Sequence, residues 1–311
     1  MTTVLEVKNL TKKFIDKKKS FLAVNNISFS LKESEILGLL GKNGAGKTTT
    51  IQMLLGVLTP TSGEISYFGK NFLSAREEIL EQVNFSSTYT SLPWELTVKE
   101  NLTYLSYLYQ IKNRPERLDR IIKIFRLEKL LNKQLEGLSS GQLTRVNLAK
   151  ALINYPRILL LDEPTASLDP EAASYIRHFL LEQRRQFKVS IILTSHNMAE
   201  VEEVCDRVIF INHGKIIDDD TPQNLARKIE TCHVELNVAD GLKRTVEICQ
   251  EQKINYKLEG RYIIVDLKEK EIPRFLQTLM EKGVSYDQIA IDKPTLEDYF
   301  LLTAKKNYEN Q

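Results

Sequence analysis

A glycine-rich segment gives the strongest chemical signal in this sequence. Residues 41–48 read GKNGAGKT, which matches the pattern G-x-x-x-x-G-K-[ST] at every position. Glycines let the backbone bend so that several N–H groups point at phosphate oxygens, and a following helix presents its positive end to the same anion. Lys47 can reach the terminal phosphates, and the Thr48 hydroxyl can ligate Mg²⁺. We therefore predict that the following residues bind the phosphates of a nucleotide: Gly41, Lys42, Asn43, Gly44, Ala45, Gly46, Lys47, Thr48 and Thr49.

Two acidic residues follow a wholly apolar run farther along the chain. Asp162 and Glu163 come directly after Ile158–Leu161. In phosphate-loop enzymes an acid at the end of such a strand completes the Mg²⁺ shell, so Asp162 is the predicted metal ligand. Neighbouring side chains on a strand point to opposite faces, and Glu163 is therefore expected to have a different role, polarising the attacking water.

The elements that must position these residues alternate between strand and helix. The apolar run Ile36–Leu40 predicts a buried parallel strand before the glycine-rich segment, with a helix from Lys47 to about Leu55 after it. The same patterns predict further helices and strands at 141–153, 158–161, 172–187, 189–194, 198–204 and 207–212. Alternation of this kind is typical of an α/β fold, in which helices pack on a mostly parallel sheet.

Two segments interrupt or precede this alternation. Leucines and isoleucines at helical spacing between about Leu96 and Leu135 predict a helical insertion, with a break at Arg114-Pro115. At the N-terminus, alternating apolar residues predict two half-buried strands around Val4–Val7 and Ile27–Leu31. Between them, the lysine run at residues 17–19 predicts a solvated hairpin.

The pattern changes at residues 218–222, where three aspartates and a threonine are followed by Pro222. We therefore expect one domain over residues 1–222, with its helical insertion at about 88–137, and a second domain over 223–311. Strands predicted at 232–237, 262–267 and 289–291, with helices at 245–251 and 273–282, make the second domain a small α+β unit.

Composition excludes several other classes of protein. The 311 residues carry a net charge of +2, which provides no electrostatic basis for binding nucleic acid. No apolar stretch approaches the roughly 20 residues of a membrane helix, and the N-terminus lacks a signal pattern, so the chain is not expected to cross a membrane by itself. Its 3 cysteines are widely spaced without zinc-site spacing, which favours a reducing compartment.

Between the two phosphate-site motifs stands a segment that suggests a family. Residues 138–142 read LSSGQ and resemble the LSGGQ signature of the ATP-binding cassette (ABC) ATPases, with Ser140 in place of the first glycine. The resemblance implies a P-loop NTPase core with an antiparallel β subdomain. It also implies that ATP bound by one subunit is contacted by the signature residues Ser139, Ser140, Gly141 and Gln142 of the other.

Other residues resemble the family pattern in the same order. Phe14 is similar to the aromatic that stacks on adenine, and Asp169 belongs to a segment similar to the loop that crosses the dimer interface. His196 resembles the switch histidine that touches the γ-phosphate, which implies a catalytic role beside Glu163. One family feature is absent: a glutamine that contacts Mg²⁺ and water is expected near Thr88, where none is found. Our hypothesis is that Ser87 or Thr88 partly replaces it.

The sequence therefore predicts an ATP-hydrolysing subunit, with ATP and Mg²⁺ bound, that powers a membrane transporter as a homodimer. The membrane-spanning permease would be a separate chain, docked on the helical insertion near Tyr89 and Trp94, at the cytoplasmic face of the cell membrane. Residues 293–300 (KPTLEDYF) are similar to the ending of exporter ATPase subunits, although a plain amphipathic helix is an alternative. A soluble ABC ATPase in an assembly or regulatory role, and a nucleotide sensor that does not hydrolyse, are the other functions considered.

Overall fold

The computed structural model describes residues 2–16, 19–87, 92–166 and 168–306. The chain divides into two compact units, Met1–Pro222 and Gln223–Gln311.

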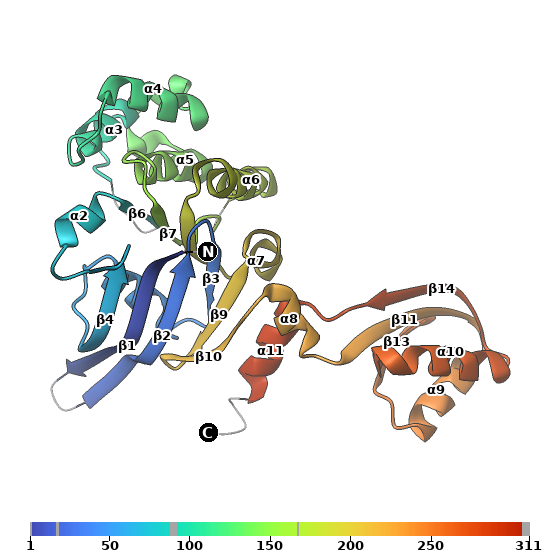
Figure 1. Cartoon of the computed structure of the whole chain (residues 1–311). Coiled ribbons are helices and arrows are strands. Elements are labelled where there is room, and N and C mark those ends of the chain that lie inside the picture. Colours follow the sequence, from blue (N-terminus) through green and yellow to red (C-terminus); the bar gives the residue numbers. More distant parts are fainter. Residues whose placement is uncertain (1, 17–18, 88–91, 167, 307–311) are drawn as a thin grey trace. The chain divides into compact units, whose positions relative to one another are not determined.

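A six-stranded sheet forms the centre of the first unit, with the strand order β10-β9-β3-β8-β7-β6 (Figure 1). All neighbouring pairs are parallel except the pair of β9 with the edge strand β10. Every residue of β3, β7 and β8 is buried, as expected for parallel strands covered on both faces. The predicted α/β fold is thus confirmed. The strands are β3 (Ile36–Leu40), β6 (Val83–Ser87), β7 (Ile158–Asp162), β8 (Ser190–Thr194), β9 (Arg207–Asn212) and β10 (Lys215–Asp220).

Helices between these strands follow the predicted alternation. The predicted bounds of α1, α5 and α6 differ from the observed ones by at most two residues at either end, and α7 was predicted without error. The short helix α2 was not predicted. The helices are α1 (Lys47–Leu54), α2 (Arg76–Leu80), α5 (Ser140–Ala151), α6 (Pro170–Phe187) and α7 (Met198–Val204).

A second, antiparallel sheet has the order β2-β1-β4-β5. Its core side chains belong to one hydrophobic cluster together with those of α1 and the central sheet. The strands are β1 (Thr3–Asp16), β2 (Lys19–Lys32), β4 (Ser62–Tyr67) and β5 (Lys70–Asn71).

The two N-terminal strands extend well beyond the segments whose alternation predicted them. Lys12 and Lys13 lie within β1, where they pair with Val24 and Leu22 of β2, while the hairpin predicted at residues 17–19 falls largely outside the described residues. The lysine stems can lie along a strand while the ammonium groups remain in water, so charge alone does not end the pairing.

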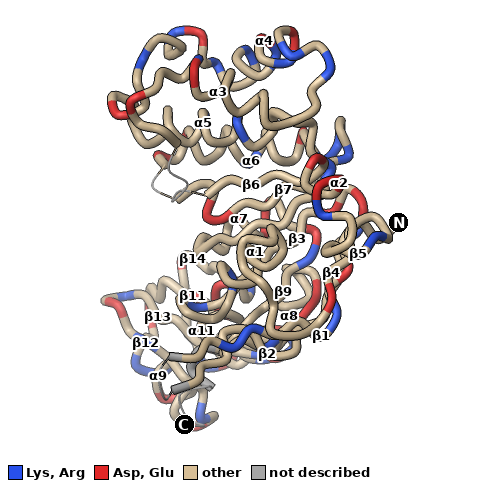
Figure 2. Tube along the Cα trace, turned by 90° about the vertical axis from the view of Figure 1, so that its left-hand side faces the viewer, with Lys and Arg blue, Asp and Glu red and all other residues tan. Residues whose placement is uncertain are grey.

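The helical insertion is described over residues 92–137, which we call the helical arm. It contains α3 (Val98–Ser106), α4 (Arg114–Ile124) and short 3₁₀ turns at Glu128–Leu130 and Leu135–Gly137. Pro115 stands in the first turn of α4, where its missing N–H is tolerated, which explains the predicted break at this point. Figure 2 shows α3 and α4 on the far side of α5 from β6 and β7, as in Figure 1.

Polar side chains join α5 to the edge strand β6. The ammonium group of Lys150 donates to the carbonyl oxygen of Phe85 at 2.9 Å. The amide of Asn84 donates to Asn154 Oδ1 at 2.7 Å, and the amide of Asn154 donates to the carbonyl of Glu81 at 2.9 Å. Burial lowers the pKa of Lys150 from 10.5 to about 8.

The Lys150→Met variant should lose a pH dependence of stability that the wild type has. Because the folded-state pKa lies below the unfolded value, the unfolded chain binds more protons between these two values, and the wild-type free energy of unfolding rises with pH there. Between pH 7.5 and 9.5 the gain should be about 2 kcal/mol relative to the variant. Urea unfolding of both proteins at these pH values measures it, and parallel pH curves would contradict the burial of the charge.

The second unit is α+β. Its antiparallel sheet has the order β12-β13-β11-β14, and one face packs on α9 and α10 in a separate hydrophobic cluster. The three predicted strands and two predicted helices are present, while the exposed strand β12 was not predicted. The elements are α8 (Pro222–Arg227), β11 (Thr231–Asp240), α9 (Leu242–Glu251), β12 (Tyr256–Glu259), β13 (Tyr262–Lys268), a 3₁₀ turn (Glu269–Glu271), α10 (Ile272–Glu281), β14 (Ser285–Asp292) and α11 (Leu296–Lys306).

Among the described residues, none of the helices combines the length and the apolar character that spanning a membrane requires.

Candidate functional site

The glycine-rich segment forms a tight loop between the end of β3 and the start of α1. Gly41, Gly44 and Gly46 have φ values of 153°, 78° and 110°, a region that side chains with a Cβ rarely adopt. A Cβ on Gly41 would lie 2.2 Å from the carbonyl oxygen of Ile211, and one on Gly46 would lie 2.4 Å from that of Ala23. Both positions therefore require glycine, and the loop is held against β9 and β2.

Lys47 begins α1 and turns its side chain back over this loop. Its ammonium group donates to the carbonyl oxygens of Gly41 at 2.6 Å and Lys42 at 3.2 Å. Burial lowers the pKa of Lys47, and the nearby carboxylates of Glu163 and Asp162 act in the opposite direction. The amine is thus held against the backbone of the loop, while the neighbouring Thr48 is exposed.

The two acids at the end of β7 are held by one threonine of the adjacent strand. The Thr194 hydroxyl donates to Asp162 Oδ1 at 2.6 Å. The backbone N–H of Glu163 donates to the same hydroxyl oxygen at 3.0 Å. Sequence reasoning did not identify Thr194, although the parallel register places it directly opposite Asp162.

Glu163 and His196 come together although they are 33 positions apart in the sequence. His196 Nε2 lies 3.0 Å from Glu163 Oε1. Glu163 has a φ of 54°, which turns its side chain away from the direction of the strand. Burial raises the pKa of Glu163, and the charges of His196 and Lys47 oppose that rise. The carboxylate is therefore a better proton acceptor than an exposed glutamate.

The signature residues form the N-terminus of α5. Ser139 is the N-cap: its hydroxyl accepts from the backbone N–H of Gln142 at 3.3 Å, and the Gln142 side chain accepts from the N–H of Ser139 at 3.2 Å. Ser140 and Gly141 form the first turn. This exposed helix end can offer its remaining N–H groups to an anion.

The remaining predicted site residues are less closely associated with the loop. Asp169 caps α6 by accepting from the N–H of Ala172 at 2.9 Å. Phe14 is 42% exposed and pairs across the hairpin with Phe21. Ser87 is buried at the end of β6, opposite Asp162 in the parallel register. Thr88 lies outside the described residues, so its predicted role is a hypothesis from the sequence.

Comparison with known proteins identifies the family to which this chain belongs. The profile of the family described as "ABC transporter" matches residues 24–166. The bacitracin transport ATP-binding protein BcrA of Bacillus licheniformis is 31% identical over 303 residues, which cover 97% of each chain. The chain belongs to the ABC transporter family. The Nod factor export ATP-binding protein I of Burkholderia orbicola is a further family member, 36% identical over 74% of this chain and 75% of its own length.

Solved structures from the family share the fold. An ATP-binding subunit of an ABC transporter superposes with a TM-score of 0.66 at 28% identity, over 72% of this chain and 92% of the other. The structure of CbiO1 from Clostridium perfringens, part of an ABC transporter complex, gives a TM-score of 0.63 at 26% identity, covering 81% of this chain and 99% of that one. The predicted P-loop NTPase core of the ABC family is thus confirmed.

Proposed function

We propose that this chain is the ATP-binding and ATP-hydrolysing subunit of a membrane transporter. The observation that carries the proposal is the convergence of three groups at the carboxyl ends of neighbouring strands. Lys47 follows β3, Glu163 follows β7 and His196 follows β8, and the three are linked by contact or charge. An ATPase needs a cation on the phosphates, a base for the attacking water and a group near the γ-phosphate.

Each residue then has a specific role. When ATP binds, Lys47 exchanges the carbonyls of Gly41 and Lys42 for phosphate oxygens. Glu163 accepts a proton from the attacking water, and His196 stabilises charge on the γ-phosphate. Asp162 and Thr48 offer the carboxylate and hydroxyl oxygens that suit Mg²⁺, which supplies charge neutralisation on the phosphates when bound. Phe14 would stack on adenine.

We further propose that two copies close head to tail around the nucleotide. The exposed start of α5, Ser139–Gln142, would contact ATP held by residues 41–49 of the other copy, and Asp169 would lie at the interface. Neither half-site is complete alone, so ATP favours the closed dimer and hydrolysis reopens it. One solved ATP-binding cassette with the same fold is a dimer in a post-hydrolysis state, bound to ADP and Pi.

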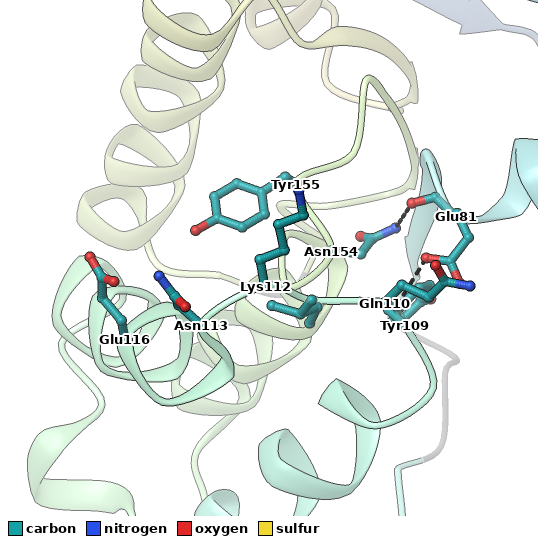
Figure 3. Close-up of a pocket in the computed structure, with 9 residues that line it drawn as sticks. Glu81, Tyr109, Gln110, Lys112, Asn113, Glu116, Asn154 and Tyr155 are labelled. Carbon is teal, nitrogen blue, oxygen red and sulfur yellow. Dashed lines mark hydrogen bonds between the residues drawn. The ribbon is translucent and has the colours of Figure 1, made fainter.

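A separate permease would dock on the helical arm. Tyr104, Tyr107 and Leu108 are exposed there at 55%, 67% and 57%, and Trp94 of the same arm at 51%. A groove of about 500 Å³ begins at Tyr109, the residue after Leu108 in the chain, and is lined by the α3–α4 loop, Glu81 and the two residues Asn154 and Tyr155 that follow α5 (Figure 3). Exposed apolar and aromatic side chains beside a groove are typical of a protein interface. Tyr89, also predicted for this surface, lies outside the described residues.

The proposal places the protein at the cytoplasmic face of the cell membrane, held there by the permease. Export is the proposed direction because Nod factor export ATP-binding proteins are among the relatives of this chain. We assign residues 223–311 to an accessory domain with a role in dimer contact or regulation. The alternative is a soluble ATPase with a role in assembly, and such a protein would have no membrane protein as its partner.

Two measurements test the proposal. Phosphate release by the purified chain with Mg²⁺ and ATP should be measurable, which a nucleotide sensor would not show. Capture from solubilised native membranes should recover a polytopic membrane protein. Leu108→Asp should lower that recovery at least fivefold, whereas Leu73→Asp, which changes a leucine that is 79% exposed outside the arm, should not. Equal recovery by both variants would contradict docking on the arm.

A further inference from the structure

A buried glutamate behind the catalytic pair makes contacts that the mechanism above does not use. Glu200 lies in α7 and is 2% exposed. Its Oε2 accepts two hydrogen bonds, from Thr165 Oγ1 at 2.6 Å and from Ser195 Oγ at 2.8 Å. Hydrogen bonds to a charged acceptor are stronger than neutral ones, and a buried carboxylate is unfavourable without them.

The two hydroxyl donors come from the segments that carry the catalytic pair. Thr165 is two residues after Glu163, and Ser195 directly precedes His196. A single carboxylate oxygen therefore joins the loop after β7 to the loop after β8. This link is buried, and its hydrogen bonds involve neither Glu163 nor His196.

Further hydrogen bonds close the turn that presents His196. The Ser195 hydroxyl also accepts from the backbone N–H of Asn197 at 3.1 Å. Asn197 in turn caps α7 by accepting from the N–H of Glu200 at 3.2 Å. The backbone on both sides of His196 is thus fixed to Glu200, while the imidazole itself is 53% exposed.

The N-cap of α7 does not depend on the Glu200 side chain, because the Asn197 side chain already makes the capping hydrogen bond with the backbone N–H of Glu200. The second carboxylate oxygen, Oε1, is buried and has no hydrogen-bond partner among the described residues. The burial of a charged carboxylate is itself unfavourable. The contribution of the Glu200 side chain is therefore its two hydrogen bonds with the hydroxyls of Thr165 and Ser195.

We propose that Glu200 is a positioning residue for ATP hydrolysis: it holds the Thr165 and Ser195 loops together and so fixes His196 against Glu163. The inference rests on the proposed function, since it assigns a use to the same site. The hydrogen bonds of Glu200 described above go to Thr165, Ser195 and Asn197 and not to the phosphate loop, and the binding of ATP is therefore expected to be independent of it.

The Glu200→Ala variant should lower kcat 10- to 100-fold while changing the KM for ATP less than twofold. Misplacement of a catalytic group by about 1 Å is enough for an effect of this size. Glu200→Gln keeps a carbonyl oxygen that can accept both hydroxyls, and should recover most of the activity. The control is Glu203→Ala on the same helix, which removes a partly buried ion pair with Arg177 and none of the hydrogen bonds to Thr165 or Ser195, and should leave kcat unchanged.

A second background separates positioning from a general loss of stability. If Glu200 acts through His196, the Glu200→Ala change should have less than a twofold effect on kcat in a His196→Ala protein, because coupled residues are not additive. An equal loss of kcat in both backgrounds, or no loss in the wild-type background, would overturn the proposal. If Glu200→Ala does not fold, Thr165→Val and Ser195→Ala combined serve the same comparison.

One readout does not need ATPase activity. The imidazole NMR resonances of His196, assigned by comparison with His196→Gln, should move in Glu200→Ala and stay in place in Glu203→Ala. Unmoved resonances would overturn the positioning role. An inactive wild type whose His196 resonances still respond to Glu200→Ala would instead contradict the proposed hydrolysis and leave the positioning role supported.

Discussion

Replacing Glu163 with glutamine should lower ATP turnover at least 100-fold and leave ATP bound between two copies of the chain. Burial raises the pKa of the Glu163 carboxylate, and its Oε1 lies 3.0 Å from His196 Nε2. The carboxylate is therefore suited to accept a proton from water. Glutamine has nearly the same shape but cannot accept that proton, and removing a general base costs about 10²–10⁴ in rate. ATP binding should remain because Lys47 and its loop are unchanged.

Two assays report this result. Phosphate release measures turnover, and size exclusion with Mg²⁺ and ATP should show a dimer for Glu163→Gln. Adding Gly141→Asp places a side chain and a negative charge at the start of α5, so the double variant should stay monomeric. Normal turnover in Glu163→Gln would exclude this carboxylate as the base, and a monomer in the presence of ATP would contradict head-to-tail closure.

The Lys47→Met variant should lose nucleotide binding without losing stability in the absence of nucleotide. Burial lowers the pKa of the ammonium group, so its charge is disfavoured where no anion accompanies it. Removing it should leave the thermal midpoint of the empty protein unchanged or higher. Without the cation on the phosphates, the dissociation constant for ATP should rise at least 10-fold.

Thermal unfolding with and without ATP measures both effects. At a concentration 100 times the dissociation constant, ATP stabilises the wild type by about 2.7 kcal/mol, and most of this gain should disappear in the variant. Lys99→Met, at an exposed lysine of α3, is the control and should keep the full gain. Restored ATP stabilisation in Lys47→Arg would mean that charge alone suffices at this position.

The sequence predicted those parts of the site that are contiguous in the chain. The loop Gly41–Lys47 lies directly between its strand β3 and its helix α1 in the chain, so residue types and spacing were enough to predict it. Asp162 and Glu163 were found for the same reason, because they end a run of apolar residues. Strands with weak or polar alternation, such as β4 and β12, gave no such signal, since their residues are largely exposed.

The parts that were missed depend on contacts between distant segments. Thr194 holds Asp162 only because β7 and β8 pair in one register, and a sequence pattern does not specify register. Glu200 looks like one of several acids on a short helix. Its burial and its contact with Thr165 became evident only from the packing of α7 against the loop after β7.

The helical arm leaves the central sheet at its edge strand β6, and the chain returns into β7, the strand directly beside it. Because β6 and β7 are parallel, the chain leaves the sheet at the end of β6, and α5 carries it back to the start of β7 at the opposite end of the strand pair. The strands that carry Lys47 and His196, β3 and β8, lie farther inside the sheet. The arm is therefore an exchangeable module: a helical segment from a relative with another permease could be grafted between β6 and α5, changing the choice of membrane partner while keeping the ATP chemistry.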